Sequence, residues 1–256
     1  KICSLAGSFA GHKIKAIGIG APGIINIQEG FIYYLPNIPG WKNFPLKKIL
    51  EKRLKIPVVI DNDANVFALA ESCLGAGKGK TRSIFLTLGT GLGGAVVING
   101  RLLQTSASAQ ELGHVPINLK GRLCGCGARG CIETEVGNKY LLKKYKQIKK
   151  NCPEGIEIKD LYHKALKGER EALKVWKDFS KALGKFLGGM INIFNPEVII
   201  FGGGVSGAFN FFKPFVYKAI KEQAMWPNLK DLKLQKARLK DAGIIGAGLL
   251  ARASCN

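Results

Sequence analysis

Two glycine-rich segments, each following a short apolar run, constrain the fold more than any other feature. Gly18–Gly23 (GIGAPG) and Gly89–Gly94 (GTGLGG) both have the G-x-G-x-x-G spacing of a dinucleotide-binding turn. Such a turn must open a helix, because the helix N-terminus holds the pyrophosphate. The apolar runs 24–27 and 95–98 follow instead. They predict two β-hairpins, which disfavours a nicotinamide-dependent oxidoreductase.

The remaining pattern mixes strands and helices. Strands are expected at 16–20, 58–60, 84–88, 95–98 and 198–201, and helices at 46–54, 64–74, 136–148, 161–165, 170–194, 211–223 and 244–253. Asn195-Pro196 should end the longest helix, because the residue before proline is driven out of the helical conformation. Since hairpins join some strands and helices join others, we predict an α/β fold with mixed sheets.

The composition bounds the class of protein. The chain has 256 residues, 46% of them hydrophobic and 22% charged, which suits one large or two small globular domains. The 39 Lys and Arg against 18 Asp and Glu give a net charge of +21. A polyanionic partner is one interpretation of this charge. A solvated, lysine-rich surface is the interpretation we favour, because net charge acts on solubility and steering.

The chain also lacks the marks of a membrane or secreted protein. Its longest uncharged run, 83–100, contains five glycines and is too polar to span a bilayer. No apolar segment of signal-peptide length stands at the start, so we expect a cytoplasmic protein. Because position 1 is Lys and not Met, we also expect residues upstream of it in the natural polypeptide.

Two glycine segments are candidates for binding a nucleotide. In a hairpin such as Gly89–Gly94, bare backbone N–H groups can close around phosphate oxygens, although an ordinary bulged hairpin is the alternative. Gly202–Gly204 lies between a predicted strand and a predicted helix, where nucleotides bind at the ends of strands. By contrast, Gly79-Lys80-Thr81 resembles the tail of a Walker A loop but lacks its first glycine, so we interpret it as a basic surface turn.

An acidic segment follows the strand predicted at 58–60. Asp61, Asn62, Asp63 and Asn65 begin the next helix, where one polar side chain would suffice as a cap. The excess favours catalysis over capping. A carboxylate at a strand end can accept a proton from a hydroxyl that attacks a phosphoryl group.

A metal site is predicted by four potential ligands within eighteen residues, namely His114, Cys124, Cys126 and Cys131. They fit the Cys3His arrangement of a structural Zn²⁺. An iron–sulfur cluster is disfavoured, because it normally needs a fourth nearby thiolate. Glu111 and Glu133 flank these ligands, a placement that favours hydrogen bonds to a hydroxyl-rich substrate.

With these motifs in order along nearly the whole chain, the sequence resembles the ROK family of sugar kinases and repressors, and in particular its zinc-containing bacterial glucokinases. The segments that carry the resemblance are Ile17–Gly23, Asn37 with Gly40–Trp41, Asp61–Asn65 with Glu71, Leu88–Gly94, Glu111–His114, Cys124–Glu133 and Asn195–Gly204. The resemblance implies an actin-like (ribonuclease H-like) fold of two lobes. The smaller would comprise residues 1–64 completed by 244–256, and the larger residues 65–243.

Carried over onto this sequence, the resemblance implies an ATP-dependent hexose kinase acting on glucose, N-acetylglucosamine, N-acetylmannosamine or fructose, with glucose preferred. Asp63 would be the general base for the sugar 6-hydroxyl, and Mg²⁺ would bridge the phosphate oxygens of ATP. Sugar hydroxyls would be bound by Asn62, Asp63, Glu111, His114 and Glu133, the phosphates by Gly89, Thr90, Gly91, Gly93 and Gly94, and the adenosine by Gly202, Gly203 and Gly204. A homodimer or larger homo-oligomer is also expected.

Two departures from the family pattern stand out. The Asp-x-Gly-Gly-Thr phosphate loop that normally precedes the Gly18 segment is missing, and we expect it upstream of Lys1. Ser108-Ala-Gln110 also replaces the usual glycines before Glu111. A sugar-sensing repressor is the alternative function, since ROK repressors share the sugar and zinc site. We favour the kinase, because no recognition helix is apparent and a repressor does not need the two glycine loops.

Overall fold

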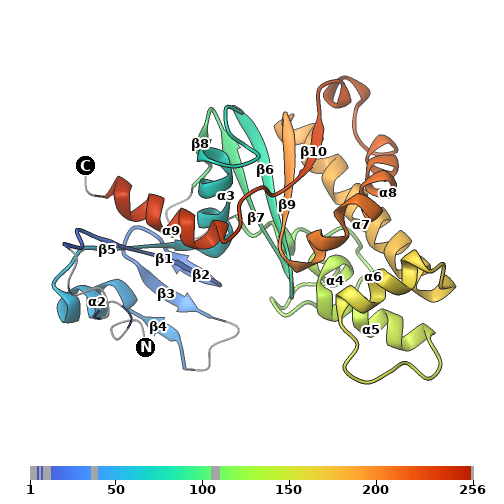
Figure 1. Cartoon of the computed structure of the whole chain (residues 1–256), viewed down its shortest axis with the longest axis horizontal. Coiled ribbons are helices and arrows are strands. Elements are labelled where there is room, and N and C mark those ends of the chain that lie inside the picture. The colour runs from blue at the N-terminus through green and yellow to red at the C-terminus, as the bar shows by residue number, and fades with distance from the viewer. Residues whose placement is uncertain (1–4, 6, 8–12, 36–39, 105–109, 255–256) are drawn as a thin grey trace. The chain divides into compact units, whose positions relative to one another are not determined.

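The computed structural model describes Leu5, Gly7 and residues 13–35, 40–104 and 110–254. The chain forms two compact units, each built from separate segments (Figure 1). Unit 1 comprises the described parts of 1–79, 95–110 and 238–256, and unit 2 comprises 80–94 and 111–237. The lobes expected from the sequence, 1–64 with 244–256 and 65–243, have different bounds, because the segments 65–79, 95–110 and 238–243 are also assigned to unit 1.

Unit 1 is built around a parallel pair of strands next to an antiparallel sheet. β1 pairs with β5, and the second sheet has the order β2-β3-β4. Figure 1 shows α9 on one side of β1 and β5 and α2 on the other. The core of unit 1 includes Ile25, Ile32 and Ile60, all fully buried. The elements are β1 (Ile17–Ala21), β2 (Ile24–Asn26), β3 (Phe31–Tyr34), β4 (Lys42–Phe44), α2 (Leu46–Leu54), β5 (Val58–Asn62), α3 (Asp63–Cys73), β8 (Arg101–Leu102) and α9 (Ala242–Ala253).

Unit 2 contains most of a five-stranded mixed sheet with the order β10-β9-β6-β7-β8. Strands β10, β9 and β6 run parallel, and β7 runs antiparallel to β8. The chain passes from unit 2 to unit 1 within β7 (Leu92–Ile98), after Gly94. The other elements are β6 (Arg82–Leu88), η1 (Leu112–His114), α4 (Glu133–Val136), α5 (Asn138–Ile148), α6 (Ile158–Leu166), α7 (Arg170–Phe194), β9 (Val198–Gly202), η2 (Gly204–Ala208), α8 (Phe209–Lys221), η3 (Trp226–Leu229) and β10 (Lys233–Lys236).

An aromatic cluster forms much of the core of unit 2. The Trp176 ring stacks on Phe212 with centroids 6.1 Å apart, and Phe179 meets Phe212 edge-on at 5.2 Å. Phe201 from β9 also contacts Phe212, so the cluster fixes α7 and α8 to the sheet. Burying such large apolar side chains supplies most of the driving force for folding.

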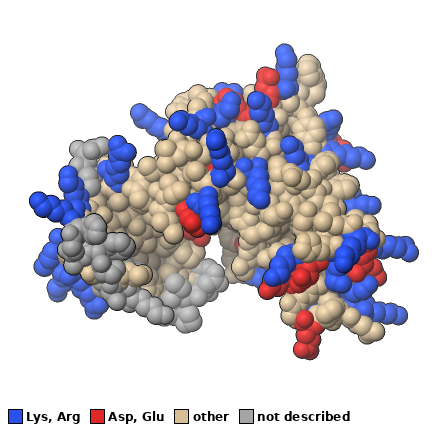
Figure 2. Space-filling view, in the orientation of Figure 1, with Lys and Arg blue, Asp and Glu red and all other residues tan. Residues whose placement is uncertain are grey.

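The surface gives no sign of one concentrated basic site on the face seen in Figure 2. There, Lys and Arg side chains are spread singly and in small groups. On this face the basic residues that contribute to the +21 charge therefore do not form a single patch. In the described part of the chain, every helix is too short or too polar to cross a bilayer.

Candidate active site

The predicted catalytic residues stand at the corner between β5 and α3 in unit 1. Asn62 caps α3, because its Oδ1 atom accepts a hydrogen bond from the backbone N–H of Ala64 at 2.8 Å. Its Nδ2 atom donates to the carbonyl oxygen of Gly23 at 3.3 Å. Both ends of this amide are therefore engaged. A bound sugar would have to share Asn62 with these contacts.

Asp61 and Asp63 lie in opposite environments although they are two residues apart. Asp61 is 1% exposed, and its carboxylate accepts hydrogen bonds from Asn62 N, Asn65 Nδ2 and Gln104 Nε2. The Asp63 side chain is exposed, yet the surrounding protein removes enough of its hydration to raise the pKa of its carboxyl. Asp63 is thus the accessible carboxylate of the corner and Asp61 the structural one.

The four predicted metal ligands come together in unit 2. The ligand atoms of His114, Cys124, Cys126 and Cys131 all lie within 4.8 Å of one another. His114 Nδ1 is 3.5 Å from Cys124 Sγ, and the Sγ atoms of Cys126 and Cys131 are 3.6 Å apart.

These separations fit a tetrahedral zinc site. With Zn–S near 2.3 Å and Zn–N near 2.0–2.1 Å, a tetrahedron has S···S edges of about 3.8 Å and S···N edges of about 3.5 Å. The observed 3.6 Å and 3.5 Å are close to both. The donor set, three thiols and one imidazole, is also one that Zn²⁺ prefers. Two of the six separations thus have the length that a tetrahedral Zn²⁺ site requires, within a group whose ligand atoms lie up to 4.8 Å apart.

Glu111 lies on the other side of the His114 ring. Glu111 Oε2 is 3.9 Å from His114 Nε2, the ring nitrogen that does not face the thiols. The short helix η1 sets this spacing, since the N–H of His114 donates to the carbonyl oxygen of Glu111 at 2.9 Å. The two side chains therefore present polar atoms on the side of the imidazole away from the cysteines.

Glu133 connects the cluster of His114 and three cysteines with the Gly89–Gly94 hairpin. Its Oε1 atom is 3.9 Å from Cys124 Sγ, and its Oε2 atom accepts a hydrogen bond from the N–H of Leu92 at 3.1 Å. A Cβ on Gly91 would lie only 2.0 Å from Oε2. Glycine is thus required at position 91 for this approach.

The two glycine segments meet at one edge of the sheet in unit 2. Thr87 pairs with Gly202, so β6 and β9 end side by side. Gly203 has a φ of +80°, and a Cβ there would come within 2.3 Å of the Leu88 carbonyl oxygen. Among the predicted nucleotide-binding residues, Thr90 lies in the turn between β6 and β7, Gly93 and Gly94 lie within β7, and Gly204 opens η2. The structure thus brings both nucleotide segments to the carboxyl ends of adjacent parallel strands, where ligands of α/β sheets bind.

The segment Gly79-Lys80-Thr81, which resembles the end of a Walker A loop, is a surface turn, as expected. Thr81 donates to Glu197 Oε2 from both its N–H and its hydroxyl at 2.8 Å, and Lys80 Nζ lies 3.7 Å from Glu197 Oε1. Hydrogen bonds from the Arg82 N–H and then from Thr81 lower the pKa of Glu197 to about 2. A resident carboxylate thus occupies the turn where a Walker A loop would take phosphate.

The sequence did not predict a role for two glutamines, one bonded to Asp61 and one directly before Glu111. Gln104 bonds to Asp61, and Gln110 pairs through its side chain with the N–H of Val96 at 2.6 Å and with the Leu103 carbonyl. The only sequence signal was the replacement of family glycines before Glu111. Asn37 and Ser108, also singled out above, lie outside the described residues.

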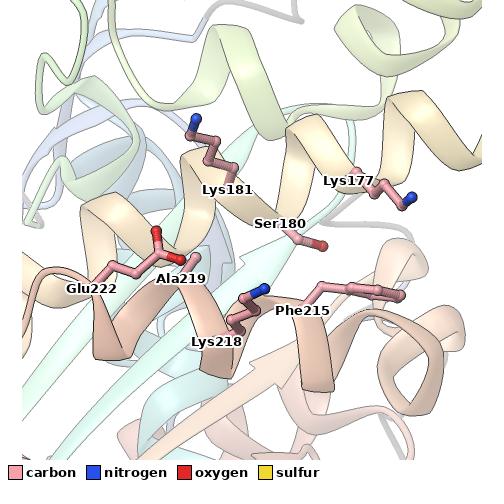
Figure 3. A pocket seen from close by; sticks show the side chains of 7 residues that line it. All are labelled: Lys177, Ser180, Lys181, Phe215, Lys218, Ala219 and Glu222. Carbon is pink, nitrogen blue, oxygen red and sulfur yellow. The ribbon is translucent and has the colours of Figure 1, made fainter.

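A groove between α7 and α8 is separate from the predicted site. Figure 3 shows lysines of both helices around it, with Phe215 and Glu222. Its volume is about 230 Å³, and it is lined by Lys177, Ser180, Lys181, Phe215, Lys218, Ala219 and Glu222. No residue with a predicted catalytic, sugar, nucleotide or metal role lines it.

Comparison with solved structures defines the class of fold. The ROK family glucokinase from Streptomyces griseus, solved with glucose and AMPPNP, superimposes with a TM-score of 0.85 at 32% identity. The match covers 98% of this chain and 86% of that one. The prediction of an actin-like α/β sugar kinase fold is confirmed.

Sequence comparison then gives the family. The ROK family profile matches residues 6–254, so the chain belongs to the ROK family. A glucokinase from Thermotoga maritima is 36% identical over 255 residues, covering 94% of this chain and 80% of that protein. A xylose repressor from Caldicellulosiruptor bescii is 31% identical over 246 residues, covering 91% of this chain and 61% of the repressor.

Proposed function

We propose that this protein transfers the γ-phosphoryl group of ATP to the 6-hydroxyl of a hexose, with glucose as the preferred substrate. The observation that carries the proposal is the Glu133–Leu92 hydrogen bond, which joins a loop rich in sugar-binding groups to a hairpin suited to phosphate. The glucokinase of Thermotoga maritima, similar along nearly this whole chain, supports the same reaction and sugar.

Asp63 is the proposed general base. Its carboxylate accepts the proton of the sugar 6-hydroxyl as that oxygen bonds to the γ-phosphorus and the bond to ADP breaks. The raised pKa of Asp63 suits this role, because a stronger base accepts the proton more readily. Asn62, Glu111, His114 and Glu133 are the proposed partners of the sugar hydroxyls.

The nucleotide is proposed to bind at the sheet edge where β6 and β9 end. Backbone N–H groups of Gly89–Gly94 would contact the phosphates, and Gly202–Gly204 would lie against the adenosine. ATP would bind together with Mg²⁺, which would offset the negative charge that develops on the phosphates during transfer. Because ATP is an intracellular substrate, a cytoplasmic location is part of the proposal. None of the described cysteines forms a disulfide.

A structural Zn²⁺ is proposed at His114, Cys124, Cys126 and Cys131. Bound there, the ion supplies a rigid anchor for the loop. His114 Nδ1 faces the thiols, so Nε2 remains directed toward Glu111 and is available to a sugar hydroxyl. The metal would thus orient a substrate-binding side chain.

An ATP-coupled assay on the full-length protein tests the proposal. Glucose, N-acetylglucosamine, N-acetylmannosamine and fructose are offered in parallel, and ADP release is followed with and without each sugar. We expect the highest kcat/KM with glucose. ADP release that is independent of sugar, or no turnover with any of the four, would contradict a hexose kinase.

A sugar-responsive repressor is the second candidate function, because the xylose repressor is similar over 91% of this chain. The kinase is favoured by the paired glycine segments at the β6–β9 edge, which a repressor has no need to keep. Gel-shift measurements with the promoter region of the protein's own operon, with and without sugar, separate the two. Sugar-sensitive binding to DNA without ATP turnover would establish the repressor.

A further inference from the structure

Gln104 reaches back to the strand end that carries the proposed base. Its Nε2 atom donates a hydrogen bond to Oδ2 of Asp61 at 2.9 Å, over a separation of 43 residues in sequence. Gln104 follows β8, whereas Asp61 lies near the end of β5, and both belong to unit 1. The contact therefore ties two distant segments of the same unit together.

The acceptor of this hydrogen bond, Asp61, is a buried carboxylate. The residue is 1% exposed, and no described lysine or arginine forms an ion pair with it. Its Oδ1 atom accepts from the N–H of Asn62 at 2.6 Å and from Nδ2 of Asn65 at 2.8 Å. In the described part of the chain, Gln104 supplies the hydrogen bond recorded at the other oxygen, Oδ2. A buried carboxylate without a cation must be held by such donors.

The same carboxylate fixes the corner on which Asp63 stands. Asp61 holds the backbone of Asn62, and Asn62 in turn accepts the N–H of Ala64. Asp63 Oδ1 accepts that N–H as well, at 2.8 Å. Gln104 is thus linked, through Asp61 and Asn62, to the backbone N–H that the Asp63 carboxylate also accepts.

We propose that Gln104 is a positioning residue for phosphoryl transfer, which acts through Asp61 to hold Asp63 in its productive orientation. The inference rests on the proposed function, in which Asp63 accepts the proton of the sugar hydroxyl. Small displacements of a catalytic group cost large factors in rate, so a residue outside the reacting set can control kcat.

The test compares three substitutions by steady-state kinetics with glucose and ATP. Gln104→Leu keeps the bulk and removes the donor, and we expect it to lower kcat about tenfold while KM for ATP changes less than twofold. Gln104→Arg restores donors to Oδ2 of Asp61 and should recover most of kcat. Gln28→Leu is the matched control, because Gln28 is also exposed in unit 1, in the β2–β3 turn, and should retain full activity.

A double-mutant cycle distinguishes positioning through Asp61 from a general loss of stability. In an Asp61→Asn background, Gln104→Leu should change kcat less than twofold, because the carboxylate that it serves is gone. If Gln104→Leu fails to fold, judged by circular dichroism, Gln104→Glu replaces it. That variant sets two carboxylates against each other and should lower kcat at least as much.

The outcomes separate this inference from the proposed function. Wild-type protein without sugar-dependent turnover contradicts the proposed function. Active wild-type protein whose Gln104→Leu or Gln104→Glu variant keeps the full kcat overturns the role of Gln104 alone. Equal losses in the wild-type and Asp61→Asn backgrounds would also overturn it, because Gln104 would then act independently of Asp61.

Discussion

The backbone N–H of Leu92 donates a hydrogen bond to Oε2 of Glu133, with 3.1 Å between the two atoms. The other oxygen of the same carboxylate lies 3.9 Å from Cys124 Sγ. The N–H of Asn138 also donates to the carbonyl oxygen of Gly89 at 2.9 Å. The proposed phosphate hairpin is thus hydrogen-bonded to the segment 111–133, which carries the proposed metal ligands, and to the start of α5. Ordering of the segment 111–133 should therefore influence nucleotide binding as well as sugar binding.

Gly91→Ala tests this connection. The new Cβ would lie 2.0 Å from Glu133 Oε2, so the carboxylate must move from the position in which it accepts the N–H of Leu92. We expect kcat/KM for ATP to fall by about 10–100-fold, since precise hydrogen-bond geometry is worth factors of this size. Gly189→Ala on the exposed face of α7, where a Cβ meets nothing within 4 Å, serves as the control. Unchanged kinetics in Gly91→Ala would mean that the hairpin adapts freely.

Loss of a proposed metal ligand should disorder the segment 111–133 and weaken sugar binding. We expect the purified protein to contain about one equivalent of zinc, and Cys126→Ser to contain far less and to show a raised KM for glucose, because metal binding provides folding energy in such loops. Cys152→Ser changes a thiol outside the cluster and should keep both zinc and KM. Elemental analysis and glucose titration measure the two effects. Zinc below about half an equivalent in the wild type would count against the site.

Much of the fold follows from local sequence. The predicted bounds of α2 and α7 agree with the structure, because α2 is amphipathic and Asn195-Pro196 stops α7 at Phe194. The helix predicted over 136–148 is instead α4 and α5, because Gly137 between them is extended and lies close to Thr90. Strands β4, β8 and β10 were not predicted. They are short and rich in polar residues, so pairing with a neighbouring strand, and not their own pattern, defines them.

The site was predictable only where its residues are close in sequence. His114 and the three cysteines lie within eighteen residues, and their spacing alone indicated a metal cluster. The hydrogen bond between Gln104 and Asp61 joins residues that are 43 positions apart. It forms only when the segment after β8 folds next to the end of β5, and no local sequence pattern predicts this. The same is true of Glu133 and Leu92, 41 residues apart, whose contact exists only once both loops have folded.

Asp63→Asn should remove most of the catalytic activity but leave glucose binding nearly unchanged. Loss of a general base typically lowers kcat by about 10²–10⁴-fold, and the amide can still hydrogen-bond to a sugar hydroxyl. Isothermal titration with glucose and the ATP-coupled assay separate binding from turnover. Turnover within tenfold of wild type would show that another group takes the proton.

The pH dependence of Asp63 has two opposite consequences. Loss of hydration to the surrounding protein raises the pKa of its carboxyl above the ordinary value of 3.8, so the folded chain binds this proton more tightly than the unfolded chain. Its contribution to stability therefore falls as pH rises from 3.8 through the raised pKa, whereas kcat rises over the same window because the base must be ionised. At pH 7 we expect Asp63→Asn to melt no lower than wild type. A kcat that persists unchanged down to pH 3.8 would contradict the assignment.

Glu71→Gln should destabilise unit 1. The Glu71 side chain is fully buried, and its Oε1 atom accepts the N–H groups of Arg238 and Leu239 at 2.9 and 2.7 Å, while Oε2 accepts that of Ala76 at 2.8 Å. An amide can present its oxygen to one side only, so at least one buried N–H would face an NH₂ group and lose its acceptor. We expect the free energy of unfolding to fall by about 1–3 kcal/mol, measured by urea denaturation. Glu29→Gln in the exposed β2–β3 turn is the control. These hydrogen bonds join the segment just before the chain leaves unit 1 at Gly79 to the segment just after it returns at Arg238. Equal urea midpoints for Glu71→Gln and Glu29→Gln would show that neither segment depends on Glu71.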